Sequence, residues 1–294
     1  MNKVGFIGVG IMGKSMVRNL MTAGFELHIY ARTKSKVEDV ISEGAQFHES
    51  IKDCVQDCDA VITIVGFPQD VEEVYFDEGN ILDSAKEGAY LIDMTTTSPQ
   101  IAEKIYEEGT KRGFHVMDAP VTGGDTGAKA GTLSILVGGE KEDYEACMPL
   151  FEAMGTNINY QGKAGCGQHC KLANQIMIAG TLSGVCEALT YVKEQGLDPE
   201  VFMKSVATGA AGSKQLDTFG PKILKDDYAP GFFMKHFIKD MKLALIEANR
   251  KGLSLDVLSM VLANYEELEQ EGYGDLGTQA LMKFYDEEHR NTEE

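Results

Sequence analysis

Near its N-terminus the chain reads Val4-Gly5-Phe6-Ile7-Gly8-Val9-Gly10-Ile11-Met12-Gly13. The apolar start predicts a short buried strand, and apolar residues at helical spacing after the glycines predict a helix. In such a strand, turn and helix, Gly8 permits a tight turn, Gly10 lets backbone approach a pyrophosphate, and Gly13 lets the helix pack on the strand. The helix start adds N–H groups and the positive end of a dipole, which favour phosphate. The stretch therefore predicts a dinucleotide site formed by Gly8, Gly10, Ile11, Met12 and Gly13.

Length and charge bound what surrounds this site. A chain of 294 residues exceeds the usual size of one domain, so we expect two. Lys and Arg number 27 against 46 Asp and Glu, which gives a formal net charge of −19. Such a surface repels nucleic acid and anionic lipid, and we expect neither as a partner. An anionic cofactor or an acidic substrate would also be repelled, so their sites must carry local cations.

We expect no targeting segment, because the first predicted strand begins within the first few residues. We also expect no apolar run long enough to cross a bilayer, and hence a cytoplasmic protein. The six cysteines include two pairs spaced four residues apart and no CxxC pair. This spacing argues against a metal site and favours reduced, mostly buried thiols.

Short β-rich runs alternate with helical periods over the first 164 residues. Alternation of this kind predicts an α/β domain, a Rossmann-like doubly wound and mostly parallel sheet. The expected strands after the first are residues 27–30, 60–65, 90–93, 115–118 and 134–137. The expected helices include residues 36–44, 69–76 and 98–112.

Beyond about residue 165 the strand signals stop. Residues 171–195 predict one long apolar helix, about 37 Å in length at the usual helical rise. It must be covered by other helices, for which residues 199–207, 241–251, 257–270 and 277–285 are candidates. We therefore expect a dinucleotide-binding domain at 1–164, joined by this central helix to an all-α substrate and oligomerisation domain at 165–294. The charged tail, residues 286–294, is expected to fray.

Four motifs in order give the chain a family resemblance. After the first glycine turn come Asp118-Ala119-Pro120-Val121-Thr122-Gly123-Gly124, then Lys171-Leu172-Ala173-Asn174-Gln175, then Lys239-Asp240. Together they resemble the β-hydroxyacid dehydrogenases, a family that includes 3-hydroxyisobutyrate dehydrogenase and tartronate semialdehyde reductase. The resemblance covers essentially the whole chain. It implies hydride transfer between a nicotinamide cofactor and a small acidic substrate.

Lys171 is the candidate general acid/base. Interconverting a hydroxy acid and an aldehyde moves a proton on or off the substrate oxygen, so one titratable group must reach that oxygen. We place Lys171 at the start of the long helix, where the helix dipole disfavours a cation and solubility alone explains a lysine poorly. Asn174 and Gln175 follow at helical spacing on the same face. The resemblance assigns proton transfer to Lys171 and substrate orientation to the two amides.

The turn formed by Thr122, Gly123 and Gly124 is the candidate substrate-binding turn. It offers a hydroxyl and approachable backbone N–H groups, which suit a carboxylate. An ordinary turn whose glycines serve only the backbone is the alternative. The resemblance favours substrate binding, although Thr122 replaces the family's usual serine. Gln175, which stands where many members have asparagine, leaves the size of the substrate open.

The end of the second expected strand indicates the cofactor. An NAD-preferring fold usually places a carboxylate there to bind the ribose 2′-hydroxyl. Here the run from residue 30 to 36 has none, and Arg32, Thr33 and Lys36 suit a 2′-phosphate instead. We therefore predict NADP, with NAD possible. The resemblance implies further cofactor contacts for Val65, Thr96 and Lys239.

The sequence thus predicts an NADP-preferring 3-hydroxyacid dehydrogenase or semialdehyde reductase that forms a homodimer or homotetramer. One alternative enzyme is a decarboxylating activity like that of 6-phosphogluconate dehydrogenase, for which the distal domain is short. Imine reductases share the fold but generally lack the lysine. A non-catalytic NADP-binding or redox-sensing protein is the alternative outside enzymes. His169 and His236 receive no role.

Overall fold

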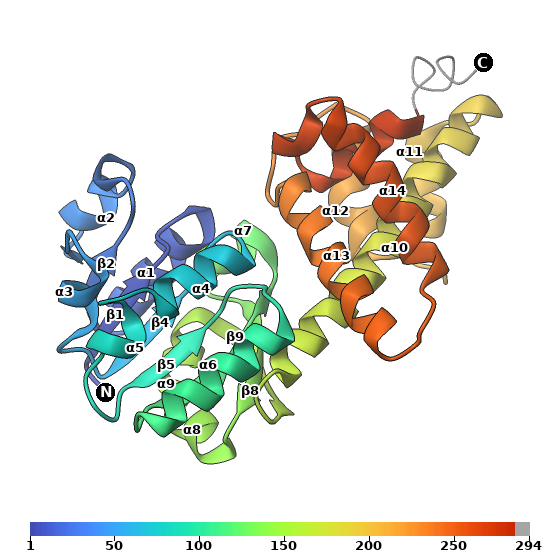
Figure 1. Cartoon of the computed structure of the whole chain (residues 1–294). Coiled ribbons are helices and arrows are strands. Elements are labelled where there is room, and N and C mark those ends of the chain that lie inside the picture. The colour runs from blue at the N-terminus through green and yellow to red at the C-terminus, as the bar shows by residue number, and fades with distance from the viewer. Residues whose placement is uncertain (286–294) are drawn as a thin grey trace. The chain divides into compact units, whose positions relative to one another are not determined.

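The structure is a computed structural model that describes residues 1–285, so the predicted frayed tail lies outside the described residues. The chain divides into two compact units, Met1–Lys171 and Leu172–Glu294 (Figure 1). The division falls inside one long helix. Each unit has a hydrophobic core of its own.

The first unit is built on one sheet, which has nine strands within the described residues. From one edge the order is β3-β2-β1-β4-β5-β6-β8-β7, and β9 pairs with β8. All neighbours from β3 to β6 are parallel, while β8 is antiparallel to β6 and β7. This order confirms the predicted doubly wound, mostly parallel sheet. The strands are β1 Lys3–Ile7, β2 Glu26–Tyr30, β3 Gln46–Phe47, β4 Ala60–Thr63, β5 Tyr90–Asp93, β6 His115–Asp118, β7 Val121–Thr122, β8 Leu133–Gly139 and β9 Gly155–Gly162.

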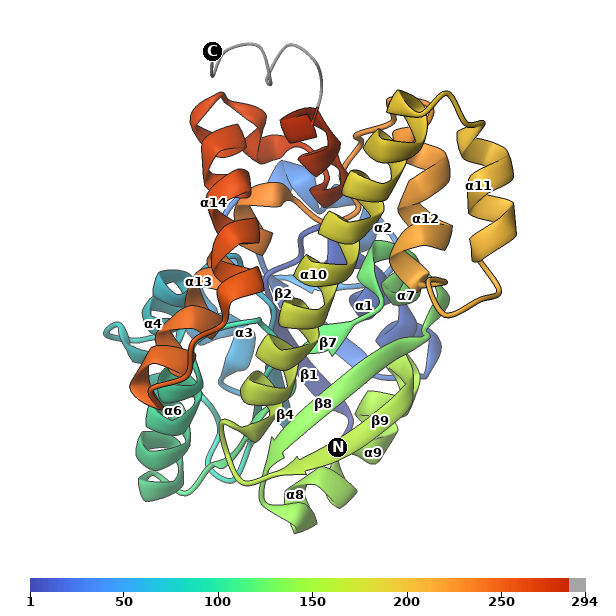
Figure 2. The ribbon, with the colours of Figure 1, turned by 90° about the vertical axis from the view of Figure 1, so that its right-hand side faces the viewer.

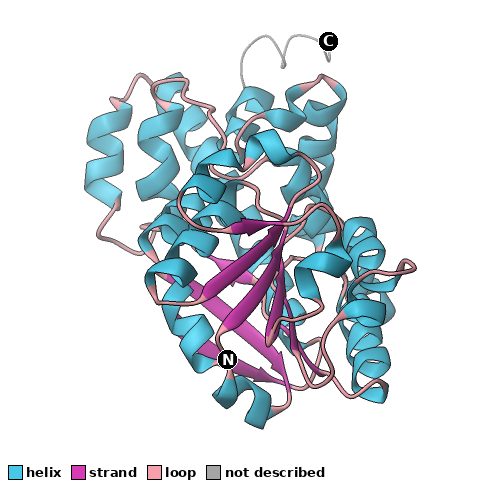
Figure 3. Cartoon of the chain, turned by 90° about the vertical axis from the view of Figure 1, so that its left-hand side faces the viewer, coloured by secondary structure: helices cyan, strands magenta, loops and turns pink. Residues whose placement is uncertain are grey.

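Helices cover both faces of the sheet (Figure 3). Because side chains alternate along a strand, Phe6 packs into one core with α1 residues while Ile7 packs into the other with α3 and α4 residues. The pattern repeats on β4, where Ile62 and Val61 face opposite cores. The helices of this unit are α1 Ile11–Thr22, η1 Lys34–Lys36, α2 Glu38–Ser42, α3 Ile51–Val55, α4 Pro68–Phe76, α5 Ile81–Ser84, α6 Pro99–Lys111, α7 Gly124–Ala130, α8 Lys141–Ala146 and α9 Met148–Met154.

Three strands, β3, β7 and β9, are absent from the sequence prediction. β3 and β7 have two residues each, too few to show a period. β9 is longer, but its sequence GTNINYQG is polar and only its first residue is buried, so it lacks an apolar alternation. It forms because β8 offers a row of backbone partners, from Leu133 to Gly138.

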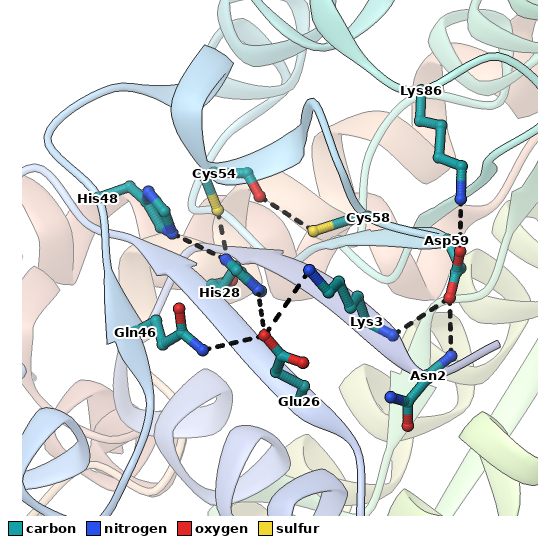
Figure 4. A network of polar contacts seen from close by, with 10 residues as sticks. All are labelled: Asn2, Lys3, Glu26, His28, Gln46, His48, Cys54, Cys58, Asp59 and Lys86. Atoms are coloured by element: carbon teal, nitrogen blue, oxygen red, sulfur yellow. Dashed lines mark hydrogen bonds and ion pairs between the residues drawn. The ribbon is translucent and has the colours of Figure 1, made fainter.

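A polar network fixes β3 against β2 at the sheet edge (Figure 4). His28 Nδ1 lies 2.9 Å from His48 Nε2, and His28 Nε2 lies 3.1 Å from Glu26 Oε1. Because a carboxylate only accepts, neutral His28 carries its proton on Nε2 and receives the His48 proton at Nδ1. Gln46 donates to the same Glu26 oxygen at 3.0 Å. Burial, and then the nearby His28, lower the pKa of His48.

The second unit contains no strand over its described residues, although one isolated β-bridge joins Phe233 and Gly277. Its core joins α10, α12, α13, α14 and η3, and Figure 2 shows α10 running among the shorter helices of this unit. Its elements are α10 Cys166–Glu194, which begins in the first unit, α11 Pro199–Val206, α12 Lys214–Ile223, α13 Met234–Arg250, α14 Asp256–Gln270, η2 Tyr273–Asp275 and η3 Thr278–Tyr285. The sequence prediction missed α12 and placed the start of α13 seven residues late.

Two expectations about the long helix are wrong. α10 starts at Cys166, five residues earlier than predicted. It is also long and apolar enough to pass for a membrane span by length and composition, whereas no such run was expected. The core of the second unit accounts for this composition, because Leu182, Cys186 and Leu189 of α10 are fully buried in it.

Candidate functional site

The glycine turn after β1 has the geometry that its sequence predicts. Gly8 has a φ of +97°, and a Cβ on it would lie 2.1 Å from the carbonyl oxygen of Ile64. A Cβ on Gly13 would lie 2.1 Å from the carbonyl oxygen of Gly8, so α1 packs directly on the turn. Gly10 differs, since a Cβ there would meet no described atom within 4 Å. Gly8 and Gly13 are therefore required by the fold, and Gly10 faces open space that suits an approaching phosphate.

The start of α1 is open to a ligand. Its N-cap, Gly10, makes no side-chain cap hydrogen bond, and the described first turn holds no acidic residue. The first intrahelical bond is donated by Lys14 N–H to the Gly10 carbonyl. The N–H groups of Ile11, Met12 and Gly13 thus precede the helical ladder, where a dinucleotide phosphate would accept them. The residues present fit the pyrophosphate of a dinucleotide.

Arg32, Thr33 and Lys36, two cations and a hydroxyl, follow β2 and are all exposed, next to this turn in the sheet order. Sequence reasoning found no carboxylate among residues 30–36, but the fold supplies one. Arg32 Nη1 lies 3.1 Å from Asp70 Oδ1, which comes from α4. No local sequence signal links these two residues, because the β4–α4 connection brings them together.

A buried polar network fixes the ends of β4 and β5. Thr63 Oγ1 donates to Asp93 Oδ1 at 2.8 Å, and the Thr95 N–H donates to the same oxygen at 3.1 Å. Thr95 in turn accepts the Val65 N–H at 3.0 Å, which positions the two predicted cofactor contacts Val65 and Thr96 on neighbouring loops. Burial raises the pKa of Asp93 to about 6. Sequence reasoning gave Asp93 no role, although a carboxylate at the end of a buried strand is a usable signal.

Asp118, at the end of β6, caps the start of α10. Its two oxygens accept the N–H groups of Gly165 and Gln168, each at 2.8 Å. Gln168 then donates to the Thr95 carbonyl at 2.7 Å and accepts the Thr97 N–H at 3.0 Å. This buried carboxylate explains the early start of α10, because it satisfies N–H groups that the helix leaves without intrahelical partners. Burial raises the pKa of Asp118, while these backbone bonds act in the opposite direction.

Lys171 therefore does not lie at the start of its helix. It is the sixth residue of α10, and the dipole argument that we gave for it is wrong, since Asp118 meets the positive helix end. Lys171 is nevertheless unusual, for a different reason: only 7% of the residue is exposed. A nearly buried lysine on an apolar helix is rare unless it has a partner or a function. Asn174 and Gln175 follow three and four residues later on the same continuous helix, so the three share a face.

The turn at Thr122 joins β7 to α7. Gly123 and Gly124 have φ values of +131° and +66°, which favour glycine at both positions. A Cβ on Gly124 would meet no described atom within 4 Å, whereas a Cβ on Gly123 would lie 3.3 Å from Leu133 Cδ2. Thr122 is half-buried. The turn is therefore open at Gly124.

In the second unit a chain of contacts links the other candidate site residues. Asn174 Nδ2 donates to Gln175 Oε1 at 2.8 Å, and Gln175 Nε2 donates to Asp240 Oδ2 at 2.6 Å. The ammonium of Lys239 lies 3.1 Å from Asp240 Oδ1. Asp240 is fully buried, whereas sequence reasoning considered it only as the lesser partner of Lys239 in their shared motif, with a surface ion pair as the alternative. Its carboxylate thus holds both Gln175 and Lys239.

The remaining candidates stay without a role. His169 is exposed, and His236 packs against the rings of Phe232 and Phe233. All six cysteines are free thiols, four of them buried. Among the described residues, no three His, Cys, Asp or Glu side chains are grouped so that they could hold a metal ion.

Two family descriptions match adjoining parts of the chain. Residues 3–162 match the NAD binding domain of 6-phosphogluconate dehydrogenase. Residues 165–285 match a family described as the NAD-binding of NADP-dependent 3-hydroxyisobutyrate dehydrogenase. Both descriptions agree with a nicotinamide cofactor, and the first of them covers the glycine turn.

Individual relatives agree with these descriptions. The probable 3-hydroxyisobutyrate dehydrogenase-like 1 of Arabidopsis thaliana is 44% identical, over 95% of this chain and 84% of the relative. The 2-hydroxy-3-oxopropionate reductase of Escherichia coli is 37% identical, over 86% of each chain. A solved structure of Mycobacterium tuberculosis 3-hydroxyisobutyrate dehydrogenase with L-serine has a TM-score of 0.88 at 26% identity and covers 96% of this chain and 98% of its own.

Proposed function

The chain belongs to the β-hydroxyacid dehydrogenase family, and from that premise we propose that it interconverts a small 3-hydroxy acid and its semialdehyde acid with NADP(H). At the coarser level it is an NAD(P)-dependent oxidoreductase with a Rossmann domain. The observation that carries the proposal is the burial of Lys171 on α10, on the face that also carries Asn174 and Gln175.

In the proposed reaction Lys171 moves the proton at the substrate oxygen. The cofactor supplies or accepts the hydride at the adjoining carbon. Reduction needs a proton on the developing alkoxide, which the Lys171 ammonium can donate, and oxidation needs the reverse transfer to the neutral amine. Asn174 orients the substrate, and its neighbour Gln175 is held by Asp240. The Thr122 hydroxyl and the backbone at Gly123 and Gly124 bind the substrate carboxylate.

Lys239 and Arg32 are the proposed cofactor cations. Lys239, next to Asp240 on α13, contacts the nicotinamide side. Arg32, with Thr33 and Lys36, binds the 2′-phosphate and makes NADP the preferred cofactor. On a chain with a net charge of −19, such exposed cations at the end of β2 offset the repulsion that an anionic cofactor meets.

A panel of acidic aldehydes assayed with both nicotinamide cofactors tests the proposal. We expect turnover of tartronate semialdehyde or methylmalonate semialdehyde with NADPH. Lys171→Met should lower kcat by about a hundredfold or more and leave NADPH affinity nearly unchanged. Lys163→Met is the matched control, because Lys163 is exposed and lies in the turn just before α10, and this variant should keep wild-type kcat.

The outcomes separate the alternatives. Tight NADPH binding without turnover of any semialdehyde would support a non-catalytic or redox-sensing protein. Oxidative decarboxylation of 6-phosphogluconate would support the alternative enzyme. A Lys171→Met variant with wild-type kcat would remove Lys171 from the mechanism. We further propose a homodimer or homotetramer, which sedimentation of the purified protein tests, and a cytoplasmic location, which cell fractionation tests.

A further inference from the structure

The ion pair between Arg32 and Asp70 is built asymmetrically. Asp70 Oδ2 accepts the Phe67 N–H at 2.9 Å and so caps the start of α4, while its Oδ1 lies 3.1 Å from Arg32 Nη1. The Asp70 side chain is only 17% exposed, but that of Arg32 is 71% exposed. The carboxylate is therefore the fixed partner, and the guanidinium is the partner that can move.

The pair also lies at a particular place in the sheet. Arg32 follows β2, Asp70 follows β4, and these two strands flank β1. The pair thus joins the loop after β2 to the first turn of α4, and these two segments follow the strands on either side of β1. This is the point where the strand order reverses, and dinucleotides bind at such points in doubly wound sheets.

The fold thereby places a carboxylate beside the residues proposed to bind the 2′-phosphate. A carboxylate near the end of β2 favours a ribose 2′-hydroxyl and disfavours a 2′-phosphate. Asp70 comes from α4 instead, forms an ion pair with the Arg32 guanidinium, and adds a negative charge close to where the phosphate would lie. Both effects oppose the bidentate contact that Arg32 could otherwise make.

We propose that Asp70 is a specificity-determining residue that restrains Arg32 and limits the preference of this protein for NADP over NAD. This inference rests on the proposed role of Arg32 in 2′-phosphate binding. It predicts an enzyme that still binds NADH usefully. Removing the Asp70 charge should release Arg32 for the phosphate.

Asp70→Asn is the direct test, because the amide oxygen can still accept the Phe67 N–H. Fluorescence titration of the purified full chain should show about three- to tenfold tighter NADPH binding and a change of less than about twofold for NADH. The gain for NADPH should shrink as salt is raised. Asp70→Ser, whose hydroxyl can also cap α4, should shift the ratio in the same direction if the asparagine variant folds poorly.

The chain offers a matched control in Asp83. It lies 2.7 Å from Arg112 Nη1 and accepts the Gly79 N–H at 3.1 Å, so it combines the same two interactions. Asp83 precedes β5 and Arg112 precedes β6, whereas the glycine turn follows β1. The control pair therefore lies at the amino ends of the parallel strands, and the glycine turn lies at their carboxyl ends. Asp83→Asn should leave both cofactor affinities unchanged.

Arg32→Ala distinguishes the two levels of the argument. If it leaves NADPH binding unchanged, both the proposed NADP preference and the role of Asp70 are wrong. If it weakens NADPH binding while Asp70→Asn fails to strengthen it, only the inference about Asp70 is overturned. Equal changes for NADPH and NADH in Asp70→Asn would also overturn it, since they would show a purely structural role.

Discussion

Alanine substitutions at Gly13 and Gly10 separate what the glycine turn does for folding from what it does for the cofactor. In Gly13→Ala the new Cβ would lie 2.1 Å from the Gly8 carbonyl oxygen, whereas ordinary contact begins at 3.4 Å. Helix α1 must therefore move away from the turn by about 1 Å. Overpacking of this size costs about 3 kcal/mol. In a domain of this size that lowers Tm by about 6–12 °C.

Gly10→Ala should behave differently. Gly10 has a φ of −87°, which any residue adopts, and no described atom lies within 4 Å of the added Cβ. We expect Tm to change by no more than about 2 °C, because the poorer cap and the reduced freedom of the unfolded chain offset each other. The methyl would stand where the pyrophosphate approaches, so NADPH affinity should fall at least about tenfold, or 1.4 kcal/mol.

Thermal unfolding by circular dichroism and NADPH fluorescence titration measure the two effects. Gly184→Ala is a control, because Gly184 lies on the exposed face of α10 with open space around it. It should stabilise the protein by about 0.5–1 kcal/mol, the usual gain inside a helix. A wild-type Tm in Gly13→Ala would refute the packing argument. Unchanged NADPH affinity in Gly10→Ala would refute the assignment of the turn to the pyrophosphate.

Three further predictions concern pH and substrate binding. The folded pKa of Asp93, about 6, exceeds its ordinary value of 3.8. The stability that protonated Asp93 contributes to the fold is therefore fully present below pH 3.8 and is lost as the pH rises through 6. Between pH 4 and 7 the free energy of unfolding of Asp93→Asn should thus rise by on the order of 3 kcal/mol relative to that of wild type, as measured by chemical denaturation at each pH. The folded pKa of His48 is lowered, so the protein should lose stability as the pH falls below about 6.5, and His48→Gln should lose less over the same range. Thr122→Val should raise KM for acidic substrates about tenfold while Thr122→Ser should not, and equal kinetics of the two would exclude a hydroxyl contact.

Much of the fold could be predicted from the sequence because its signals are local. The strand, glycine turn and helix at residues 4–21, the strands that end at Asp93 and Asp118, and the long apolar helix follow from turn chemistry and periodicity over a few residues. The same holds for the family resemblance, since motifs such as Lys171 to Gln175 are contiguous. Gly13 is required by the Gly8 carbonyl oxygen, which the turn itself brings close, whereas the atom that excludes a Cβ at Gly8 is the Ile64 carbonyl oxygen at the end of the neighbouring strand β4.

Other features depend on which strands and helices become neighbours. β9 has no apolar period and forms only because β8 pairs with it. α10 begins at Cys166 because Asp118, 47 residues before Gly165, accepts its first N–H groups. The site follows the same rule, since Gln175 is held by Asp240 from 65 residues away.

The pair of Arg32 and Asp70 shows why sequence reasoning could not complete the cofactor site. Reading the residues after β2 found cations and no carboxylate, and that reading was correct for the run itself. The carboxylate comes from α4, because β2 and β4 both lie next to β1 in the sheet. Periodicity and turn chemistry act over a few residues and specify each element. The electrostatic environment of a side chain is instead decided by strand order, which brings together charges that are distant in the sequence.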